Sequence, residues 1–307
     1  MANLTLNGGT SVPVLAFGCG TALLKKNREA DEIDQGTVET IKSAIRVGYR
    51  HLDTAEMYNT EREVGEAIRE SIDEGVVERK DLFVTTKIFG NYTQAQTAID
   101  ISLHKLKLDY VDSYLIHSPY WTKSETELQA AWAAMESVKE SGKARSIGLS
   151  NFEEPHIRAV LAAARIPPSI NQVELHPYMP QSDLVCFSRS PDAAGIAISA
   201  YGALAPVTRN IPGPLDDTLE ALAQKYGVSA AVVCMRWCID QDIVVVTTSR
   251  HLERMEEYLR VFDFKLTERE VKEISDKGAI TVKGQNAELI PRVVKYYRSK
   301  GVDIPGH

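Results

Sequence analysis

Two kinds of hydrophobic pattern alternate along the chain. Short apolar runs bounded by glycine or polar residues predict buried strands, and longer stretches with apolar residues at helical spacing predict helices. Residues 36–47 are typical of the second kind, because Val38, Ile41, Ala44 and Ile45 fall on one side of a helix. The first kind predicts strands at 15–18, 50–53, 82–87, 112–117, 144–149, 170–173, 195–200 and 243–246.

Helical patterns follow most of these strands. They predict helices at 36–47, 60–72, 94–106, 125–141, 155–164, 182–194, 215–226, 229–241, 253–261 and 267–276. Thr60 and Glu63 have the spacing of a capping box, and Gly142 suits a left-handed helix end. A β-hairpin over 4–14, turning at Asn7-Gly8, precedes the first buried strand. The tail beyond 276 is punctuated by proline and glycine, and its segment 295–300 either covers a pocket or docks elsewhere.

The regular order of strand and helix decides the fold class. Strands that alternate with helices run parallel, and eight such units predict a closed (β/α)8 TIM barrel. We therefore expect this α/β barrel, with a short N-terminal β-hairpin and extra C-terminal helices, as a single domain over 1–307. A doubly wound sheet is the rival fold. Gly18-Cys19-Gly20 supplies only two glycines of its fingerprint, because position 23 is leucine.

Polar residues stand at nearly every predicted strand end. In a barrel of this type the chemistry lies at the C-terminal ends of the strands. Those ends carry Asp53, Lys87, His117, Ser150, Asn151, Gln172, Tyr201 and Thr247, and Tyr58 follows the second of the eight strands closely. This concentration predicts an active site rather than a set of solvated loop residues.

Four of these residues form a proton-transfer set. The Tyr58 hydroxyl can give a proton, although its ordinary pKa is about 10, and a Lys87 ammonium beside it is expected to lower that pKa. Asp53 can hold Lys87 charged, and His117 can orient a carbonyl oxygen. The set contains no nucleophile and no metal-binding cluster. The reaction therefore needs an external hydride, which indicates a nicotinamide cofactor and no metal.

The composition of the chain limits the kinds of molecule that it is expected to bind. The 307 residues carry a net charge of −7, which argues against nucleic acid or an anionic membrane as partner. No apolar run reaches membrane-spanning length, and the N-terminus lacks the pattern of a signal peptide, so a cytoplasmic protein is expected. The four cysteines form no CxxC pair, which predicts reduced, packed thiols.

The segments 48–58, 115–117, 148–151 and 172–174, together with Lys87, resemble the aldo-keto reductase superfamily over essentially the whole barrel. The resemblance implies that Tyr58 is the general acid and that Asp53, Lys87 and His117 are its partners. It also implies a set of cofactor-binding residues: Thr21, Asp53, Ser150, Asn151, Gln172, Tyr201, Gly202, Ala203, Leu204, Thr247, Thr248, Ser249, Arg250, Arg254 and Glu257.

The adenosine end departs from the family pattern. Members often carry Lys-Ser followed by an arginine five residues past the serine, which holds a 2′-phosphate. Here Thr248 replaces the lysine, whereas Ser249 and Arg254 remain and Arg250 adds a charge. Arginine binds phosphate through two parallel hydrogen bonds. NADPH is therefore the expected cofactor.

The predicted substrate pocket departs as well. Ala22 and Ser118 stand where many members carry tryptophan, which widens the mouth. The substrate residues expected are Ala22, Tyr58, Phe89, His117, Tyr120 and Trp121. These features are most similar to the conjugated polyketone reductase branch, which reduces ketopantoyl lactone and related cyclic diketones.

The expected function is NADPH-dependent reduction of a small carbonyl compound by a monomer or weak homodimer. Two alternatives stay open. One is a regulatory subunit that binds NADPH and senses its redox state without significant turnover. The other is a lyase or isomerase that uses no cofactor.

Overall fold

The structure is a computed structural model that describes residues 2–25, 32–209, 212–284, 291–301 and 304. Eight parallel strands close into a barrel in the order β10-β3-β4-β5-β6-β7-β8-β9. The predicted (β/α)8 fold is therefore confirmed, and the doubly wound sheet is excluded. The strands are β3 (Leu15–Gly18), β4 (His51–Asp53), β5 (Phe83–Ile88), β6 (Val111–Ile116), β7 (Ala144–Ser150), β8 (Ile170–Glu174), β9 (Ala197–Tyr201) and β10 (Val244–Thr247).

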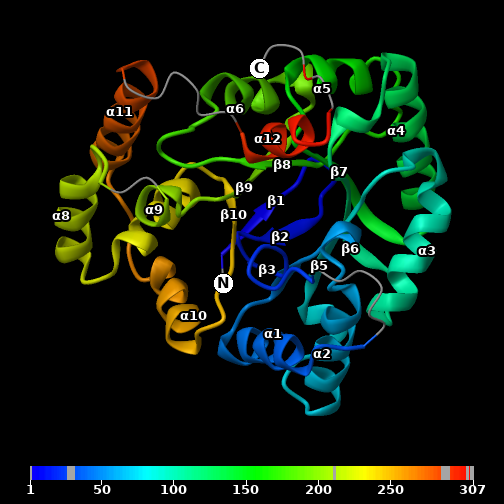
Figure 1. Ribbon diagram of the computed structural model, residues 1–307, viewed down its shortest axis with the longest axis horizontal. Coiled ribbons are helices and arrows are strands. Elements are labelled where there is room, and N and C mark those ends of the chain that lie inside the picture. The colour runs from blue at the N-terminus through cyan, green and yellow to red at the C-terminus, as the bar shows by residue number, and fades with distance from the viewer. Residues whose placement is uncertain (1, 26–31, 210–211, 285–290, 302–303, 305–307) are drawn as a thin grey trace.

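Helices surround the barrel as an outer ring (Figure 1). They bury their apolar sides against the strands, and strands and helices share one large hydrophobic core. The helices are α1 (Gln35–Val47), α2 (Glu61–Asp73), α3 (Ala95–Leu106), α4 (Glu125–Glu140), α5 (Glu154–Leu161), α6 (Ser182–Arg189), α7 (Ala205–Thr208), α8 (Asp216–Tyr226), α9 (Ala230–Ile239), α10 (Leu252–Leu259), α11 (Glu268–Gly284) and α12 (Arg292–Arg298).

The N-terminal hairpin closes one end of the barrel. Its strands β1 (Asn3–Thr5) and β2 (Ser11–Pro13) pair antiparallel, as predicted. Leu6 and Val12 form a buried cluster with Phe83 and Val244, which are the first residues of β5 and β10. The Asn7 side chain donates hydrogen bonds of 2.9 and 3.1 Å to the carbonyls of residues 168 and 194, which precede β8 and β9. The hairpin therefore seals the end where the strands start.

One local prediction is wrong. Thr60 makes no side-chain cap hydrogen bond at the start of α2. Its hydroxyl donates instead to the Cys19 carbonyl at 2.9 Å and lies 3.1 Å from the Thr54 hydroxyl. The Glu63 carboxylate accepts hydrogen bonds from Lys25 and from the Asp34 amide. Thr60 and Glu63 therefore do not cap α2; they form contacts between loops at the end of the barrel where the strands end.

Two further expectations concern metals and membranes. Within the described ranges, no group of three or more His, Cys, Asp or Glu could hold a metal ion. No helix in that part of the chain is long and apolar enough to cross a membrane.

The four cysteines differ in burial. Cys19, Cys234 and Cys238 are buried free thiols, whereas Cys186 is exposed, so the prediction of four packed thiols is wrong for Cys186.

Candidate active site

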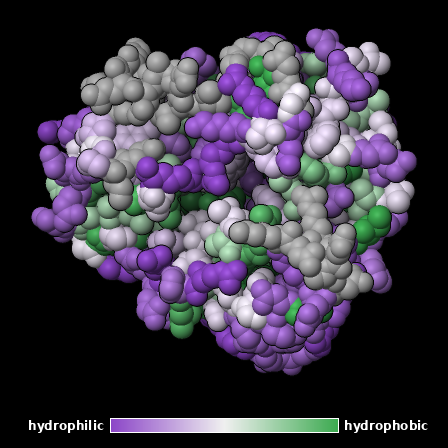
Figure 2. Space-filling model, in the orientation of Figure 1, coloured by the Kyte–Doolittle hydropathy of each residue, from purple (hydrophilic) through white to green (hydrophobic). Residues whose placement is uncertain are grey.

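A cavity of about 510 Å³ opens where the strands end. Figure 2 shows the hollow near the centre of this face. Its volume lies within the usual range for small-molecule and cofactor sites. It is lined by Gly18, Gly20, Thr21, Asp53, Met57, Tyr58, Phe89, His117, Ser118, Ser150, Asn151, Gln172, Tyr201, Gly202, Ala203, Leu204, Thr208, Arg209, Val246, Thr247, Thr248, Arg292, Tyr296 and Tyr297.

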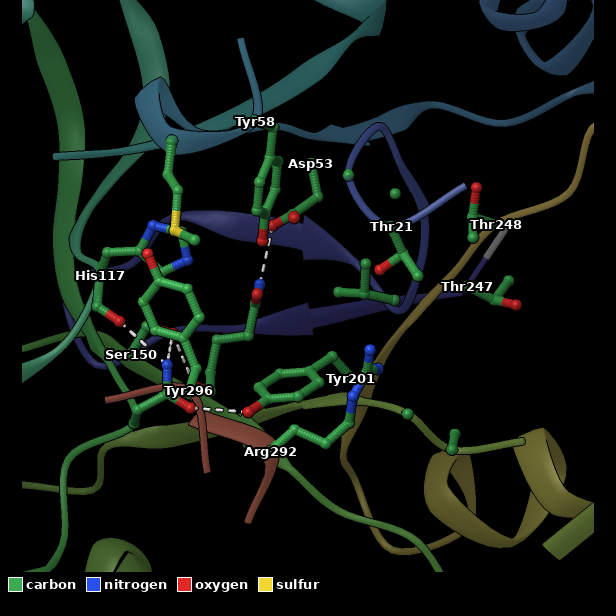
Figure 3. Close-up of a pocket in the computed structure, with 18 of the residues that line it drawn as sticks. Thr21, Asp53, Tyr58, His117, Ser150, Tyr201, Thr247, Thr248, Arg292 and Tyr296 are labelled. Carbon is green, nitrogen blue, oxygen red and sulfur yellow. Dashed lines mark hydrogen bonds between the residues drawn. The ribbon is translucent and has the colours of Figure 1, made fainter. Parts of the chain in front are cut away.

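Three of the predicted proton-transfer residues, Asp53, Tyr58 and His117, line this cavity (Figure 3), and the fourth, Lys87, lies behind them in contact with Asp53. Lys87 is fully buried, and its ammonium donates to the Asp53 carboxylate at 2.6 Å and to the Thr54 carbonyl at 3.0 Å. The same ammonium lies 5.0 Å from the centre of the Tyr58 ring. The Tyr58 and His117 rings meet edge to face, with 5.4 Å between their centres. Three strand ends and one adjoining turn therefore supply one cluster.

The local chain fixes the position of Tyr58. A short 3-10 helix, Glu56–Tyr58, carries it directly after β4 and ends at Asn59, whose φ of 55° is left-handed. The Glu56 carboxylate accepts a 2.9 Å hydrogen bond from the Phe89 amide, which ties this turn to the end of β5. On the other side Gly20 leaves room for the ring, because a Cβ atom there would lie 2.8 Å from it. The phenol is thus held between two neighbouring loops.

The charges in the cluster set the protonation states. Burial raises the pKa of Tyr58 above its ordinary value, and the positive charge of Lys87 offsets only part of that rise. The prediction of a lowered Tyr58 pKa is therefore wrong for the net shift, because desolvation outweighs the ammonium. Burial lowers the pKa of Lys87, but Asp53 and Tyr58 raise it by more, so the net shift is upward. Burial and the Lys87 charge hold the pKa of His117 well below 6.5.

These shifts give the cluster a definite chemical capacity. At neutral pH the phenol keeps its proton, the lysine is charged and the imidazole is neutral. A neutral phenol beside a fixed ammonium can protonate an oxygen that is becoming negative. The His117 Nδ1 atom is buried and has no hydrogen-bond partner among the described residues.

A second network carries the predicted amide and hydroxyl residues. The Asn151 amide donates to the His117 carbonyl at 2.9 Å and to the Ser150 hydroxyl at 3.0 Å, and its oxygen accepts from Tyr201 at 2.8 Å. The Gln172 amide donates to the second Asp53 oxygen at 2.7 Å. This network joins the cluster to the Tyr201 ring, which faces the cavity (Figure 3).

Further residues predicted to bind the cofactor line the same cavity. Gly202, which has a positive φ of 76°, leads into Ala203 and Leu204, and these three residues line the cavity together with Thr247 and Thr248. The Thr248 hydroxyl is buried and has no partner within the described chain. Buried polar atoms are normally satisfied, so this hydroxyl fits contact with a polar ligand. Thr21 lines the same cavity.

Four residues assigned to the cofactor lie outside the cavity lining: Ser249, Arg250, Arg254 and Glu257. The Ser249 hydroxyl accepts from the His251 amide at 3.0 Å, so it is engaged at the start of α10. The Arg250 Nε donates to the Ala22 carbonyl at 2.9 Å. Arg254 is exposed and Glu257 half-buried on α10. Their assignment to the adenosine end stays a prediction about this adjoining surface.

The substrate side requires a correction. Phe89 lines the cavity, whereas Ala22, Tyr120 and Trp121 do not. Tyr297 of α12 lines it instead and packs edge to face on Tyr120 and Trp121, with centre distances of 5.3 and 5.7 Å. Tyr120 and the exposed Trp121 therefore contact Tyr297 without lining the cavity, and the carbonyl of the exposed Ala22 accepts a hydrogen bond from Arg250.

The tail question is answered as well, because α12 supplies Arg292, Tyr296 and Tyr297 to the lining. Tyr296 and Tyr297 belong to the segment 295–300, for which the sequence left a pocket cover and a docked tail as alternatives. The sequence reasoning did not name Arg292 as a lining residue, nor Met57, Thr208, Arg209 and Val246.

Comparison with known proteins gives a consistent result. The family model described as "Aldo/keto reductase family" matches residues 16–279. An NAD/NADP-dependent indole-3-acetaldehyde reductase of Schizosaccharomyces pombe is 36% identical over 273 residues, covering 88% of this chain and 93% of that protein. The crystal structure of Bombyx mori aldo-keto reductase (AKR2E4) in complex with NADP is 37% identical, with a TM-score of 0.80, and the match covers 90% of this chain and 92% of that one. The chain therefore belongs to the aldo/keto reductase family.

Proposed function

We propose that this protein is an NADPH-dependent carbonyl reductase. The observation that carries the proposal is the cluster of Tyr58, Lys87, Asp53 and His117 at one cavity, beside the amide network that ends at Tyr201. The similarity to a reductase solved with NADP supports the choice of cofactor.

The cofactor would supply the hydride, and the chain's own residues would hold it and move the proton. Tyr201 offers a flat ring whose hydroxyl is fixed by Asn151. Ser150 and Gln172, at neighbouring strand ends, offer polar groups for the carboxamide. Gly202, Ala203 and Leu204, which follow Tyr201 in the chain and line the cavity, would receive the pyrophosphate. The unpaired Thr248 hydroxyl would contact the adenosine side.

Proton transfer would then fall to the cluster. Tyr58 would donate its proton to the carbonyl oxygen as negative charge develops there. Lys87 would stabilise that charge from behind, and its bond to Asp53 keeps the ammonium in place. Neutral His117 would position the same oxygen without competing as a proton source.

The proposed substrates are conjugated cyclic diketones such as ketopantoyl lactone. The support is the shape of the wall: Ser118 lines the cavity where many members carry tryptophan, which leaves room for a ring. Phe89 and Tyr297 line the same cavity and offer flat apolar faces. A planar diketone would pack between such faces better than a long aliphatic aldehyde.

The test is a panel of carbonyl compounds with NADPH and NADH, followed at the absorbance of the reduced nicotinamide. Ketopantoyl lactone, a second cyclic diketone and a linear aldehyde form the panel. With the best substrate, Tyr58→Phe is expected to lower turnover by about 10²-fold or more, because the general acid is lost. NADPH binding and the melting temperature should stay unchanged.

Near wild-type turnover by the phenylalanine variant would contradict the mechanism. NADPH binding without oxidation by any compound of the panel would favour a cofactor-sensing subunit instead. A linear aldehyde preferred over both diketones would refute the substrate class alone.

A further inference from the structure

Two arginines bring positive charge into the cavity. Among the described residues that line it, Arg209 and Arg292 are the only side chains that are always cationic. They come from distant parts of the chain, the segment after α7 and the first residue of α12. A cavity that takes a dinucleotide must balance the charges of its phosphates, so the state of each arginine matters.

Arg209 already has a partner. Its guanidinium lies 3.0 Å from a Glu174 oxygen, and Glu174 is buried at the end of β8. The second oxygen of Glu174 accepts a 2.7 Å hydrogen bond from the backbone amide of Arg292. One buried carboxylate therefore neutralises Arg209 and also anchors the start of α12 at the barrel rim.

Arg292 is in a different state. Its backbone amide is held by Glu174, but its guanidinium forms no ion pair or hydrogen bond with any residue that the structure describes. Figure 3 shows the side chain running beside Tyr201 into the cavity. Burial raises the pKa of the Tyr201 hydroxyl, and the nearby charge of Arg292 opposes that rise, which agrees with their proximity. Glu174 thus holds the backbone of Arg292 and leaves the Arg292 guanidinium without an ion-pair partner among the described residues at the cavity.

The surroundings of this cation indicate which anion it suits. Gly202, Ala203 and Leu204 line the cavity after Tyr201, and Thr247 and Thr248 line it at the end of β10. Gly202, Ala203 and Leu204 are the residues assigned above to the pyrophosphate, and Thr248 is the residue assigned to the adenosine side.

We propose that Arg292, presented by the C-terminal helix α12, binds the pyrophosphate of the nicotinamide cofactor. The planar guanidinium can donate two parallel hydrogen bonds to phosphate oxygens. The inference rests on the proposed function, because it assumes that a nicotinamide dinucleotide occupies the cavity. Glu174 is the positioning residue, since it fixes the backbone that carries the guanidinium.

The experiment measures NADPH binding directly, by quenching of protein fluorescence, in the full chain. Arg292→Gln is compared with Arg298→Gln, because both arginines are exposed on the same helix but only Arg292 lines the cavity. A hydrogen bond to a charged group contributes enough for Arg292→Gln to raise the Kd for NADPH about tenfold or more. Arg298→Gln should leave it unchanged, and Arg292→Lys should restore part of the affinity.

Salt supplies a second readout. Because the contact is between charges, the Kd of the wild type should rise more steeply with salt than that of Arg292→Gln. Equal slopes and equal affinities in the two proteins would overturn the inference. A rise in KM confined to carboxylate-bearing ketones, with the NADPH Kd unchanged, would also overturn it and assign Arg292 to the substrate. Failure of the wild type itself to bind NADPH would refute the proposed function instead.

Discussion

The two ends of the barrel are built from the same strands for opposite purposes. Where the strands start, Phe83, Ile170 and Val244 pack against the hairpin in an apolar cluster. Where they end, β5 places Lys87 beside the cavity-lining Asp53, and β10 supplies Thr247 to the cavity lining. The six-residue strand β5 thus begins in the apolar cluster that supports the fold and ends beside the proposed catalytic residues. The contrast shows that stability and reactivity can be assigned to opposite ends of one element.

The contrast extends to the chain termini. The N-terminal hairpin fills its end with side chains such as Leu6 and Val12, which are almost fully buried. The C-terminal helix α12 covers the other end without filling it, and a cavity of about 510 Å³ remains beneath Arg292, Tyr296 and Tyr297. One terminus acts as a plug and the other as part of a ligand-binding wall. Substitutions at the two ends should therefore affect different measurements.

The largest effect is expected at the sealed end. Phe83→Ala removes a buried ring that contacts His51 edge to face, at 4.7 Å between centres. The lost burial and the cavity left behind should lower the free energy of unfolding by about 3–5 kcal/mol. Urea unfolding followed by circular dichroism measures the loss.

Turnover and the NADPH Kd of this variant should match the wild type at temperatures where it stays folded. Tyr58→Phe is the matched substitution, because it alters an aromatic side chain at the open end and should leave unfolding unchanged. A large loss of turnover in folded Phe83→Ala would show that the two ends are coupled.

A smaller effect is expected from one methyl group at the open end. Gly20→Ala would place a Cβ atom 2.8 Å from the Tyr58 ring, so the ring must move. A displacement of about 1 Å at a reacting group can reduce turnover by about 10²-fold. We therefore expect Gly20→Ala to lower turnover by between about tenfold and about 10²-fold. Steady-state kinetics with the best diketone measures it.

Gly8→Ala is the control at the sealed end, since its new Cβ would meet only the Lys139 ammonium at 3.6 Å, an ordinary contact. It should leave turnover unchanged. If both alanine variants retained full activity, Tyr58 would not need the position that the structure gives it.

The sequence predicted the barrel and the cluster for one physical reason. Strand periodicity locates the end of each strand, and parallel strands bring all those ends to one rim. Asp53, Lys87 and His117 could therefore be grouped without coordinates, and Tyr58 could be added because it follows β4 closely. The family resemblance then assigned roles that residue types alone left open.

The remaining part of the site depends on contacts that no local pattern encodes. Tyr297 replaces Tyr120 and Trp121 at the cavity because α12 is anchored by Glu174, which lies more than a hundred positions earlier in the chain. The prediction of a capping box at Thr60 was wrong for a related reason. The Thr60 hydroxyl donates to the Cys19 carbonyl, which lies far away in the sequence. The net shift of the Tyr58 pKa also depends on burial, which spacing along the chain does not measure.

The smallest expected effect is a flat pH profile for carbonyl reduction. His117 has a pKa well below 6.5, so it is already neutral at that pH. The pKa values of Tyr58 and Lys87 are both raised, so the phenol keeps its proton and the ammonium its charge up to about pH 10, the ordinary value for a phenol. The kcat/KM for reduction should therefore stay nearly constant between about pH 6.5 and about pH 10.

The reverse reaction tests the same assignment with the opposite sign. Oxidation of the alcohol product needs Tyr58 as a base, so its rate should rise about tenfold per pH unit while the phenol remains mostly protonated. A lowered pKa of Tyr58 would instead flatten that rise below about pH 10 and make reduction fall within the same range. Measuring both directions over one pH series therefore separates a phenol governed by burial from one governed by its neighbouring ammonium.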